Sequence, residues 1–291
     1  MLGALADHAR HLAGLGTELG REGRALLRER RAHRPAPPDA GLVVDVGGGD
    51  RPDPRADLVV DKYVVDDFER GGDLTFARPV VVADGEALPF ADRSFDYLVA
   101  AHVLEHAIDP VRMAGEFARV APRGFVQVPS ADAERVYGWP FHPWLVTRRG
   151  QTLVFRPKEH DAPTAGRVMH DVYDESLLVR LGWAAHRSRW HHSLQWSGRI
   201  DVDVEGERVF HEQAALDLDR TLSALRELGA AGRVVSLDER LRALLRDPDP
   251  ACRGVVVLKG DAAVCRECGT RYPAPGGVPV LLAEAAVSAV R

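Results

Sequence analysis

The chain has 291 residues, of which 45% are hydrophobic and 28% charged, and its formal net charge is −5. This composition is typical of a globular protein with a substantial core, and the acidic balance excludes recruitment of nucleic acid or anionic membrane by overall charge. No apolar run approaches the ~18 residues of a membrane-spanning helix. Charged residues interrupt the first ten positions before a signal-peptide core is complete, so we expect a cytoplasmic protein.

Residues 1–36 are predicted to form a helical extension. Leucines recur at helical spacing over the first 15 residues, and prolines at positions 35, 37 and 38 end the pattern. Residues 21–34 hold six arginines and two glutamates. Such a stretch can contact phosphates, but a solvated helix face is the favoured interpretation.

The main domain is predicted over residues 37–232, where the hydrophobic pattern changes to short apolar runs. Such runs are typical of strands that are buried on both faces of a parallel sheet. An amphipathic helix is expected within residues 100–120, so the pattern favours an α/β fold with a doubly wound, mainly parallel sheet. The runs are Leu42–Val46, Leu58–Val60, Val80–Ala83, Tyr97–Ala100 and Phe125–Val128.

The strand pattern ends near residue 131 and does not resume until about residue 175. An insertion of this length is usually functional, so we expect a lid over the sheet. Residues 192–196 and 200–204 are predicted as an antiparallel pair, and residues 213–228 as a helix. Residues 233–291 are expected to form a further helix and a small β module that carries all three cysteines.

The segment Val43–Asp50 predicts a ligand site. Its apolar run ends in Asp45 and three glycines, as expected where a strand ends and the backbone must approach a ligand. Asp61 and Asp84 end the next two runs, and the carboxyl ends of parallel strands meet at one edge. The two oxygens of Asp61 match the hydroxyls of a ribose. Pro52 stands where a dinucleotide fingerprint requires its third glycine, which disfavours nicotinamide and flavin cofactors.

Four segments within residues 41–130 resemble, in order, the motifs of class I S-adenosylmethionine-dependent methyltransferases of the type 11 branch. They are Asp45-Val-Gly-Gly-Gly, Asp61, Asp84-Gly-Glu-Ala-Leu-Pro-Phe and Ala101-His-Val-Leu-Glu-His106. The resemblance implies a Rossmann-like seven-stranded sheet with an antiparallel last strand, and S-adenosylmethionine as cofactor.

The same resemblance implies roles for single residues. It places glycines 47 and 49 beside the methionine part of the cofactor, Asp61 on the ribose and Asp84 near the adenine. Arg51 departs from the family's small residues and is expected to pair with the methionine carboxylate. The alternative is a cofactor-free sheet whose aspartates cap helices. The predicted cofactor-binding residues are Asp45, Gly47, Gly48, Gly49, Arg51, Asp61, Lys62, Asp84, Gly85 and Ala101.

Two histidines are the catalytic candidates. Methyl transfer from a sulfonium needs an aligned nucleophile in a site shielded from water, and a base only where the acceptor must lose a proton. His102 follows the fourth strand and is expected near the transferred methyl group, and His106 lies one helical turn further on. The alternative for His106 and Glu105 is that they only fasten this segment to the sheet.

Aromatic residues of the insertion are the candidates for binding the acceptor. Their rings could enclose a planar or apolar molecule, or they could form a satellite hydrophobic cluster under a long loop. The cluster comprises Tyr137, Trp139, Phe141, His142 and Trp144.

The C-terminal cysteines resemble the zinc ribbons of methyltransferase activator subunits, with Cys265-Arg-Glu-Cys268-Gly-Thr-Arg-Tyr-Pro as the well-matched half. Aligning the two knuckles puts Asp249 where the first cysteine should stand, followed by Cys252. A zinc site made of Asp249, Cys252, Cys265 and Cys268 is one interpretation. A ribbon that has lost its metal is the other.

These features together predict S-adenosylmethionine-dependent methyl transfer to a small-molecule acceptor. A small molecule is favoured because the chain is acidic overall and the lid is expected to enclose the site. The alternatives are an RNA or protein methyltransferase, and a non-catalytic protein that binds S-adenosylmethionine. The sequence predicts no membrane partner, and it predicts neither the acceptor atom nor the oligomeric state.

Overall fold

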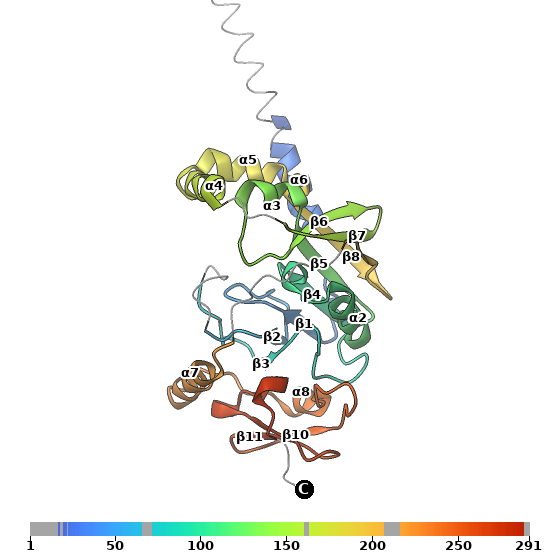
Figure 1. Cartoon of the computed structure of the whole chain (residues 1–291), viewed down its shortest axis with the longest axis vertical. Coiled ribbons are helices and arrows are strands. Elements are labelled where there is room, and N and C mark those ends of the chain that lie inside the picture. The colour runs from blue at the N-terminus through green and yellow to red at the C-terminus, as the bar shows by residue number, and fades with distance from the viewer. Residues whose placement is uncertain are drawn as a thin grey trace, which may run out of the picture.

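The computed structural model of the chain describes residues 17, 20, 21, 23–65, 72–159, 163–206 and 216–287 (Figure 1). All five predicted apolar runs are strands, and they supply the centre of one sheet. These strands are β1 (Val43–Val46), β2 (Leu58–Asp61), β3 (Val80–Ala83), β4 (Tyr97–Ala101) and β5 (Arg123–Pro129).

The central sheet has seven strands in the order β13-β3-β2-β1-β4-β5-β8. β8 (His191–Ser197) pairs antiparallel with β5, and every other pair in this sheet is parallel. The predicted α/β fold with a mainly parallel seven-stranded sheet is therefore confirmed. The strand at the other edge, β13 (Val280–Leu281), comes from the C-terminal module, which the sequence pattern did not indicate.

Both faces of the sheet are covered, which explains the continuous apolar runs. On one face Val44 and Val60 pack in the same cluster as Phe117 of α2 (Pro110–Val120). On the other face Val59 lies in a cluster with Leu225 of α7 (Leu218–Ala230). Burying each such side chain contributes about 1.5–3 kcal/mol to folding.

The N-terminal extension is helical over residues 23–32, and residues 1–16 lie outside the described part. Glu29 is buried and accepts a hydrogen bond from Ser188 N (2.5 Å), in α6 (Arg187–Trp190). The Nδ1 atom of His33 lies 2.7 Å from Ser193 Oγ in β8. The end of this helix is therefore attached to the same edge of the molecule as β8.

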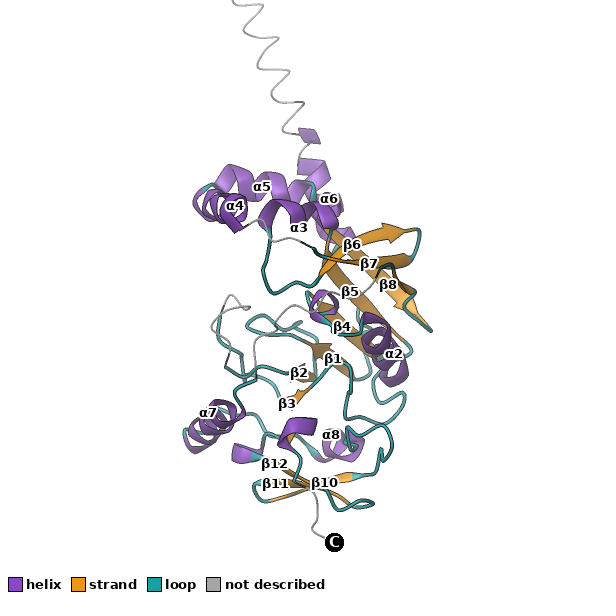
Figure 2. Ribbon diagram, in the orientation of Figure 1, coloured by secondary structure: helices purple, strands orange, loops and turns teal. Residues whose placement is uncertain are grey.

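The predicted lid insertion is built of regular elements rather than loop. Figure 2 shows its helices gathered at one end of the molecule, with the C-terminal module at the opposite end. The elements of the insertion are α3 (Ala131–Tyr137), β6 (Trp144–Arg149), β7 (Thr152–Pro157), α4 (Pro163–Glu175) and α5 (Leu177–Ala185).

Among the described residues, no helix has both the length and the apolar character needed to cross a membrane.

The predicted antiparallel pair over residues 192–196 and 200–204 is wrong. β8 pairs with β5 in the central sheet, whereas β9 (Val202–Val204) pairs parallel with β7 in a separate three-stranded sheet. In the described part of the chain, one isolated bridge, between Ser197 and Arg199, joins the residues that follow the first segment to those that precede the second. The segments follow one another in sequence, but each pairs with a strand from an earlier part of the chain.

The C-terminal module is joined to the central sheet by several contacts besides β13. Arg253 donates to Leu88 O (2.9 Å) and to Glu116 Oε1 (3.0 Å), which lies on α2. The boundary predicted at residues 232 and 233 stays a prediction, and the last strand of the sheet lies beyond it. The elements are α8 (Glu239–Leu244), β10 (Val256–Lys259), β11 (Ala262–Cys265), β12 (Arg271–Pro273), η2 (Pro275–Gly277), β13 and η3 (Ala283–Ala285).

Candidate functional site

A cavity of about 390 Å³ lies at the carboxyl ends of β1, β2, β3 and β4. Its volume falls within the range of ~300–1,000 Å³ that is usual for small-molecule sites. Eleven of the twelve residues predicted for the cofactor or for catalysis line it. They are Gly47, Gly48, Gly49, Arg51, Asp61, Lys62, Asp84, Gly85, Ala101, His102 and His106.

The turn after β1 requires glycine. Gly47 has φ of 70° and Gly49 has φ of 54°, a region that favours glycine because it lacks a Cβ. A Cβ on Gly47 would collide with Val103 Cγ2 across the cavity wall. The amide of Gly47 donates to Val60 O (2.7 Å), which fixes the turn against β2.

We expect Gly47→Ala to destabilise the fold by about 2 kcal/mol or more, because it adds a steric collision to left-handed strain. Gly150→Ala is the matched control, since Gly150 has φ of 62° but no atom within 4 Å of the added Cβ. Thermal unfolding of both variants measures the difference. Equal losses of stability in the two variants would contradict a steric role for the turn.

Two of the three strand-end carboxylates line the cavity, each with a different partner. Asp61 Oδ1 accepts a hydrogen bond from Tyr63 N (3.0 Å). Lys62 Nζ donates to Asp84 Oδ2 (2.8 Å). Burial disfavours the Lys62 charge, but the Asp84 carboxylate outweighs this effect and raises the pKa of Lys62. The carboxylate of Asp84 therefore borders the cavity while it is paired with the ammonium group of Lys62.

Asp45, the third strand-end carboxylate, does not line the cavity. It is 4% exposed, and its Oδ2 accepts a hydrogen bond from Asp53 N (2.6 Å). Burial raises the pKa of Asp45 to about 7. The side chain thus supports the glycine turn from behind instead of reaching a ligand.

His102 carries the strained backbone of the site. Its φ is 59°, an uncommon value for a residue with a side chain, and its amide donates to Gln127 O (2.8 Å). The Nδ1 atom of His102 lies 3.2 Å from Glu105 Oε1. Glu105 is fully buried, which acts to raise its pKa, but the hydrogen bond and charge of His102 outweigh burial and lower the pKa. The carboxylate therefore orients an imidazole that borders the cavity.

Several further cavity residues were not predicted, among them Val103, Glu86 and Met113. Glu86 Oε1 accepts hydrogen bonds from Ile108 N (2.5 Å) and Asp109 N (3.0 Å), at the start of α2. Glu86 falls inside the third motif, two residues after Asp84, so the motif contained a signal for it.

A family model for a methyltransferase domain matches residues 55–127, which include β2, β3, β4, α2 and the cavity residues Asp61, Asp84 and His102. The chain carries a class I S-adenosylmethionine-dependent methyltransferase domain. The sheet has the seven strands and the one antiparallel strand, β8, that the motifs imply, although β13 follows β8 in the chain.

Two curated relatives that this chain matches are called uncharacterized methyltransferases. One methyltransferase, of Mycolicibacterium paratuberculosis, is 30% identical over 146 residues, which are 43% of this chain and 56% of the relative. Another, of Mycobacterium avium, is 32% identical over 127 residues, which are 39% of this chain and 49% of the relative. The chain spans about half the length of the curated relatives it matches.

A solved structure is also similar to this chain. It is a complex of the Haloferax volcanii Trm112 methyltransferase activator with a methyltransferase. The similarity has 17% identity and a TM-score of 0.35, and it covers 64% of this chain and 95% of that chain.

The structure does not place the four predicted acceptor-binding residues of the methyltransferase domain on the cavity wall. Trp144 is 2% exposed, and its Nε1 donates to Ala107 O (2.8 Å), so it is a core residue. Tyr137 is also buried, with its ring stacked on Trp139 at 5.3 Å between centroids. His142 is buried beside His106, with ring centroids 4.6 Å apart. Within the described residues, His106 links this cluster to the cavity, since its ring contacts that of His142.

A buried ion pair lies behind this aromatic cluster. Lys158 Nζ donates to Glu134 Oε1 (2.8 Å), and both side chains are at most 4% exposed. The Oε2 atom of Glu134 lies 2.7 Å from His142 Nδ1. Burial raises the pKa of Glu134 to about 7, against the opposing effect of Lys158. These contacts fix the position of the His142 ring.

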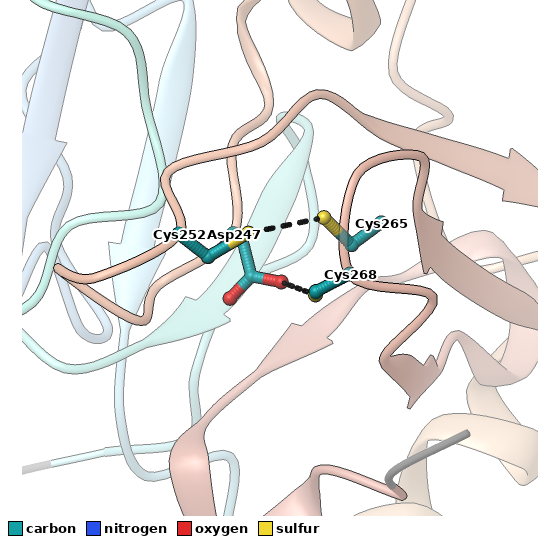
Figure 3. A group of neighbouring side chains, drawn as sticks. All are labelled: Asp247, Cys252, Cys265 and Cys268. Carbon is teal, nitrogen blue, oxygen red and sulfur yellow. Dashed lines mark hydrogen bonds between the residues drawn. The ribbon is translucent and has the colours of Figure 1, made fainter. Parts of the chain in front are cut away.

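The three cysteines gather in the C-terminal module together with Asp247, and the ligand atoms of all four lie within 4.8 Å of one another (Figure 3). Cys252 Sγ and Cys265 Sγ are 3.6 Å apart, and Cys268 Sγ is 3.2 Å from Asp247 Oδ2. Asp247 is fully buried and also accepts a hydrogen bond from Tyr272 OH (2.9 Å).

The predicted ligand Asp249 lies outside this cluster, and Asp247 takes its place. Asp249 is exposed, its Oδ1 accepts from Ala251 N (2.9 Å), and its carbonyl accepts from Cys252 N (3.0 Å). Its side chain therefore stabilises the turn that carries Cys252. A spacing of four residues between Asp247 and Cys252 replaces the two-residue knuckle that the alignment assumed.

The donor set fits tetrahedral zinc. With Zn–S bonds of ~2.3 Å, two thiolates on one ion stand about 3.8 Å apart, close to the distance between Cys252 and Cys265. A carboxylate oxygen is also an accepted zinc ligand. Three thiols and a carboxylate that converge at one point, with Asp247 and Cys265 buried, form a donor set that a cation would neutralise.

Proposed function

We propose that this chain transfers the methyl group of S-adenosylmethionine to a small-molecule acceptor. The observation that carries the proposal is the convergence of four strand ends on one cavity, lined by the glycine turn and by Asp61, Asp84 and His102. The acidic net charge supports a small molecule over a nucleic acid. The cofactor supplies an electrophilic methyl group on a sulfonium, whose displacement leaves a neutral thioether.

The residues of the cavity suit such a cofactor. The exposed backbone of Gly47 to Gly49 allows close approach of its polar amino acid part. Asp61 ends β2 with a carboxylate whose two oxygens match the ribose hydroxyls. Asp84, paired with Lys62, is proposed to contact the adenine. Arg51 is exposed and 3.3 Å from Asp50, within reach of a carboxylate in the cavity.

His102 is proposed to act as a general base where the acceptor must lose a proton. Its Nδ1 faces Glu105, so the hydrogen bond favours the tautomer with a proton on Nδ1 and leaves Nε2 to accept one. The His102 side chain is 44% exposed, as access to an acceptor requires. Glu105 acts through His102 as a positioning residue.

The first experiment is conversion of S-adenosylmethionine to S-adenosylhomocysteine by the purified chain with a panel of small hydroxyl, amine, thiol and carbon acceptors. Turnover with an acceptor supports the proposal. Tight cofactor binding without turnover on any small molecule, together with methylation of RNA or protein, would contradict the small-molecule acceptor.

With an acceptor in hand, His102→Ala is expected to lower kcat by roughly 10²-fold or more while the affinity for S-adenosylmethionine stays within a few-fold of wild type. His186→Ala, which changes an exposed histidine after α5, is the control. Steady-state rates and calorimetry measure the two effects. An unchanged kcat in His102→Ala would remove the base from the mechanism.

Zinc held by Asp247, Cys252, Cys265 and Cys268 is proposed to stabilise the C-terminal module. The contacts of Arg253 with Leu88 and Glu116, and the pairing of β13 with β3, pass this stabilisation to the methyltransferase domain. The role is structural, since the cysteine cluster and the cavity share no residue.

A further inference from the structure

A second group of metal-ligating side chains lies at the wall of the cavity. Glu105 and His106 belong to η1 (Leu104–His106), and His142 follows α3. One ligand atom from each of the three lies within 4.8 Å of the others. Glu105 and His142 are buried, whereas His106 is partly exposed and borders the cavity.

Glu105 presents a carboxylate oxygen that has no hydrogen-bond partner. Its Oε1 faces His102, but its Oε2 is buried without a partner among the described residues. A buried carboxylate oxygen left unsatisfied costs free energy, since it has lost its water and gained nothing. A cation beside Oε2 would remove that cost.

The ring of His142 is held in the orientation of a ligand. Its Nδ1 is 2.7 Å from Glu134 Oε2, a carboxylate that also binds Lys158. Histidines that bind metals usually donate one ring nitrogen to such a carboxylate, which leaves the other nitrogen for the ion. The rings of His142 and His106 are perpendicular, at 89°, with centroids 4.6 Å apart.

We propose that Glu105, His106 and His142 bind a divalent transition-metal ion, of the zinc or iron class, at the wall of the cavity beside His106. Two imidazoles and one carboxylate are a common donor set for such ions. Metal–ligand bonds of ~2.0–2.2 Å allow ligand atoms at most about 4.4 Å apart, so small side-chain rotations complete the site.

The three protein ligands leave a coordination position open, and His106 puts the ion next to the cavity. This position would take a hydroxyl of the acceptor and lower its pKa. The favoured acceptor is then an oxygen nucleophile, an inference that rests on the proposed function. Its O–H proton passes to His102 Nε2, the oxygen bonds to the methyl carbon, and the carbon–sulfur bond breaks to release the neutral thioether.

The experiment measures bound metal in the full-length chain. After equilibrium dialysis against zinc, Glu105→Gln and His142→Ala are expected to hold about one zinc fewer per chain than wild type. Glu105→Gln preserves the shape of the side chain, so it tests the site even if His142→Ala folds poorly. His186→Ala is the control and is expected to match wild type. Equal zinc content in wild type and in Glu105→Gln would overturn the proposal.

Cobalt distinguishes this site from the cysteine cluster. Cobalt bound by Glu105, His106 and His142 lacks the thiolate-to-metal charge-transfer bands that the three cysteines would produce. Loss of the weaker visible cobalt bands in Glu105→Gln, while the thiolate bands persist, supports the site. Visible bands that are unaffected by Glu105→Gln contradict the site. Calorimetry with S-adenosylmethionine on the same samples tests the proposed function separately. A wild-type chain that binds S-adenosylmethionine but holds no second metal ion contradicts only this inference.

Discussion

Replacing Asp61 with alanine is expected to weaken S-adenosylmethionine binding by roughly 100-fold or more. Each hydrogen bond to a charged group contributes ~1.5–3 kcal/mol, and the carboxylate is proposed to accept two from the ribose. Asp61 ends β2 at the cavity wall, where no other carboxylate of the described residues takes its place at that strand end. Calorimetric titration of the wild type and of the variant measures the effect.

Asp219→Ala is the control for this experiment, because Asp219 is an exposed residue in the first turn of α7. It should leave the affinity for the cofactor unchanged. Asp61→Asn is a useful third variant, since it keeps the shape of the side chain and removes the charge. A wild-type chain that binds no S-adenosylmethionine, or an Asp61→Ala variant that binds as well as wild type, would overturn the proposed cofactor site.

Asp247→Asn is expected to lose zinc and to lower the Tm by roughly 5 °C or more. An amide oxygen is a poorer zinc ligand than a carboxylate, and structural zinc contributes directly to folding free energy. The effect should reach the whole chain, because the C-terminal module supplies β13 to the central sheet. Metal analysis and thermal unfolding monitored by circular dichroism measure the two changes.

The matched control is Asp249→Asn, two residues away in the same turn. Its amide can still accept the hydrogen bond from Ala251 N, and the structure places it outside the cysteine cluster. We expect this variant to keep both zinc and stability. Loss of zinc in Asp249→Asn but not in Asp247→Asn would restore the ligand set predicted from the sequence. A wild-type chain that is free of zinc after purification without chelators would leave the module without a metal.

The five parallel strands could be predicted because a strand that is buried on both faces consists of consecutive apolar residues. Sheet geometry likewise explains why the predicted residues converge at the cavity. Residues that end neighbouring parallel strands must meet, so Asp61, Asp84 and His102 could be brought together without any structure.

The pairing of strands β8 and β9 could not be predicted in the same way. A short apolar run indicates a strand but does not say which strand it joins, and neighbours in sequence were the natural choice. The contribution of β13, only two residues long, was hidden for the same reason. Strand partners are set by contacts between segments that are distant in the sequence. The spacing of apolar residues along one segment carries no information about those contacts.

The errors at single site residues have local causes. Asp247 and Asp249 are two residues apart in the sequence, and only the fold decides which of the two carboxylates faces the cysteines. Trp144 and Tyr137 belong to an aromatic sequence that suits a lid and a core equally well, and the insertion proved to have a core of its own. The sequence left open whether Glu105 takes part in the site or only fastens its segment to the sheet, because the burial of Glu105 arises from the packing of η1.

The edge of the central sheet beside β3 is completed by β13, which is synthesised long after β3. Until Val280 and Leu281 arrive, the backbone of Val82 and Ala83 has an unpaired side, and an unpaired strand edge invites association with other chains. Pairing between segments so far apart also slows folding. Expression of this chain should therefore depend strongly on chaperone capacity during synthesis, and shortened versions that end before residue 280 should accumulate as aggregates.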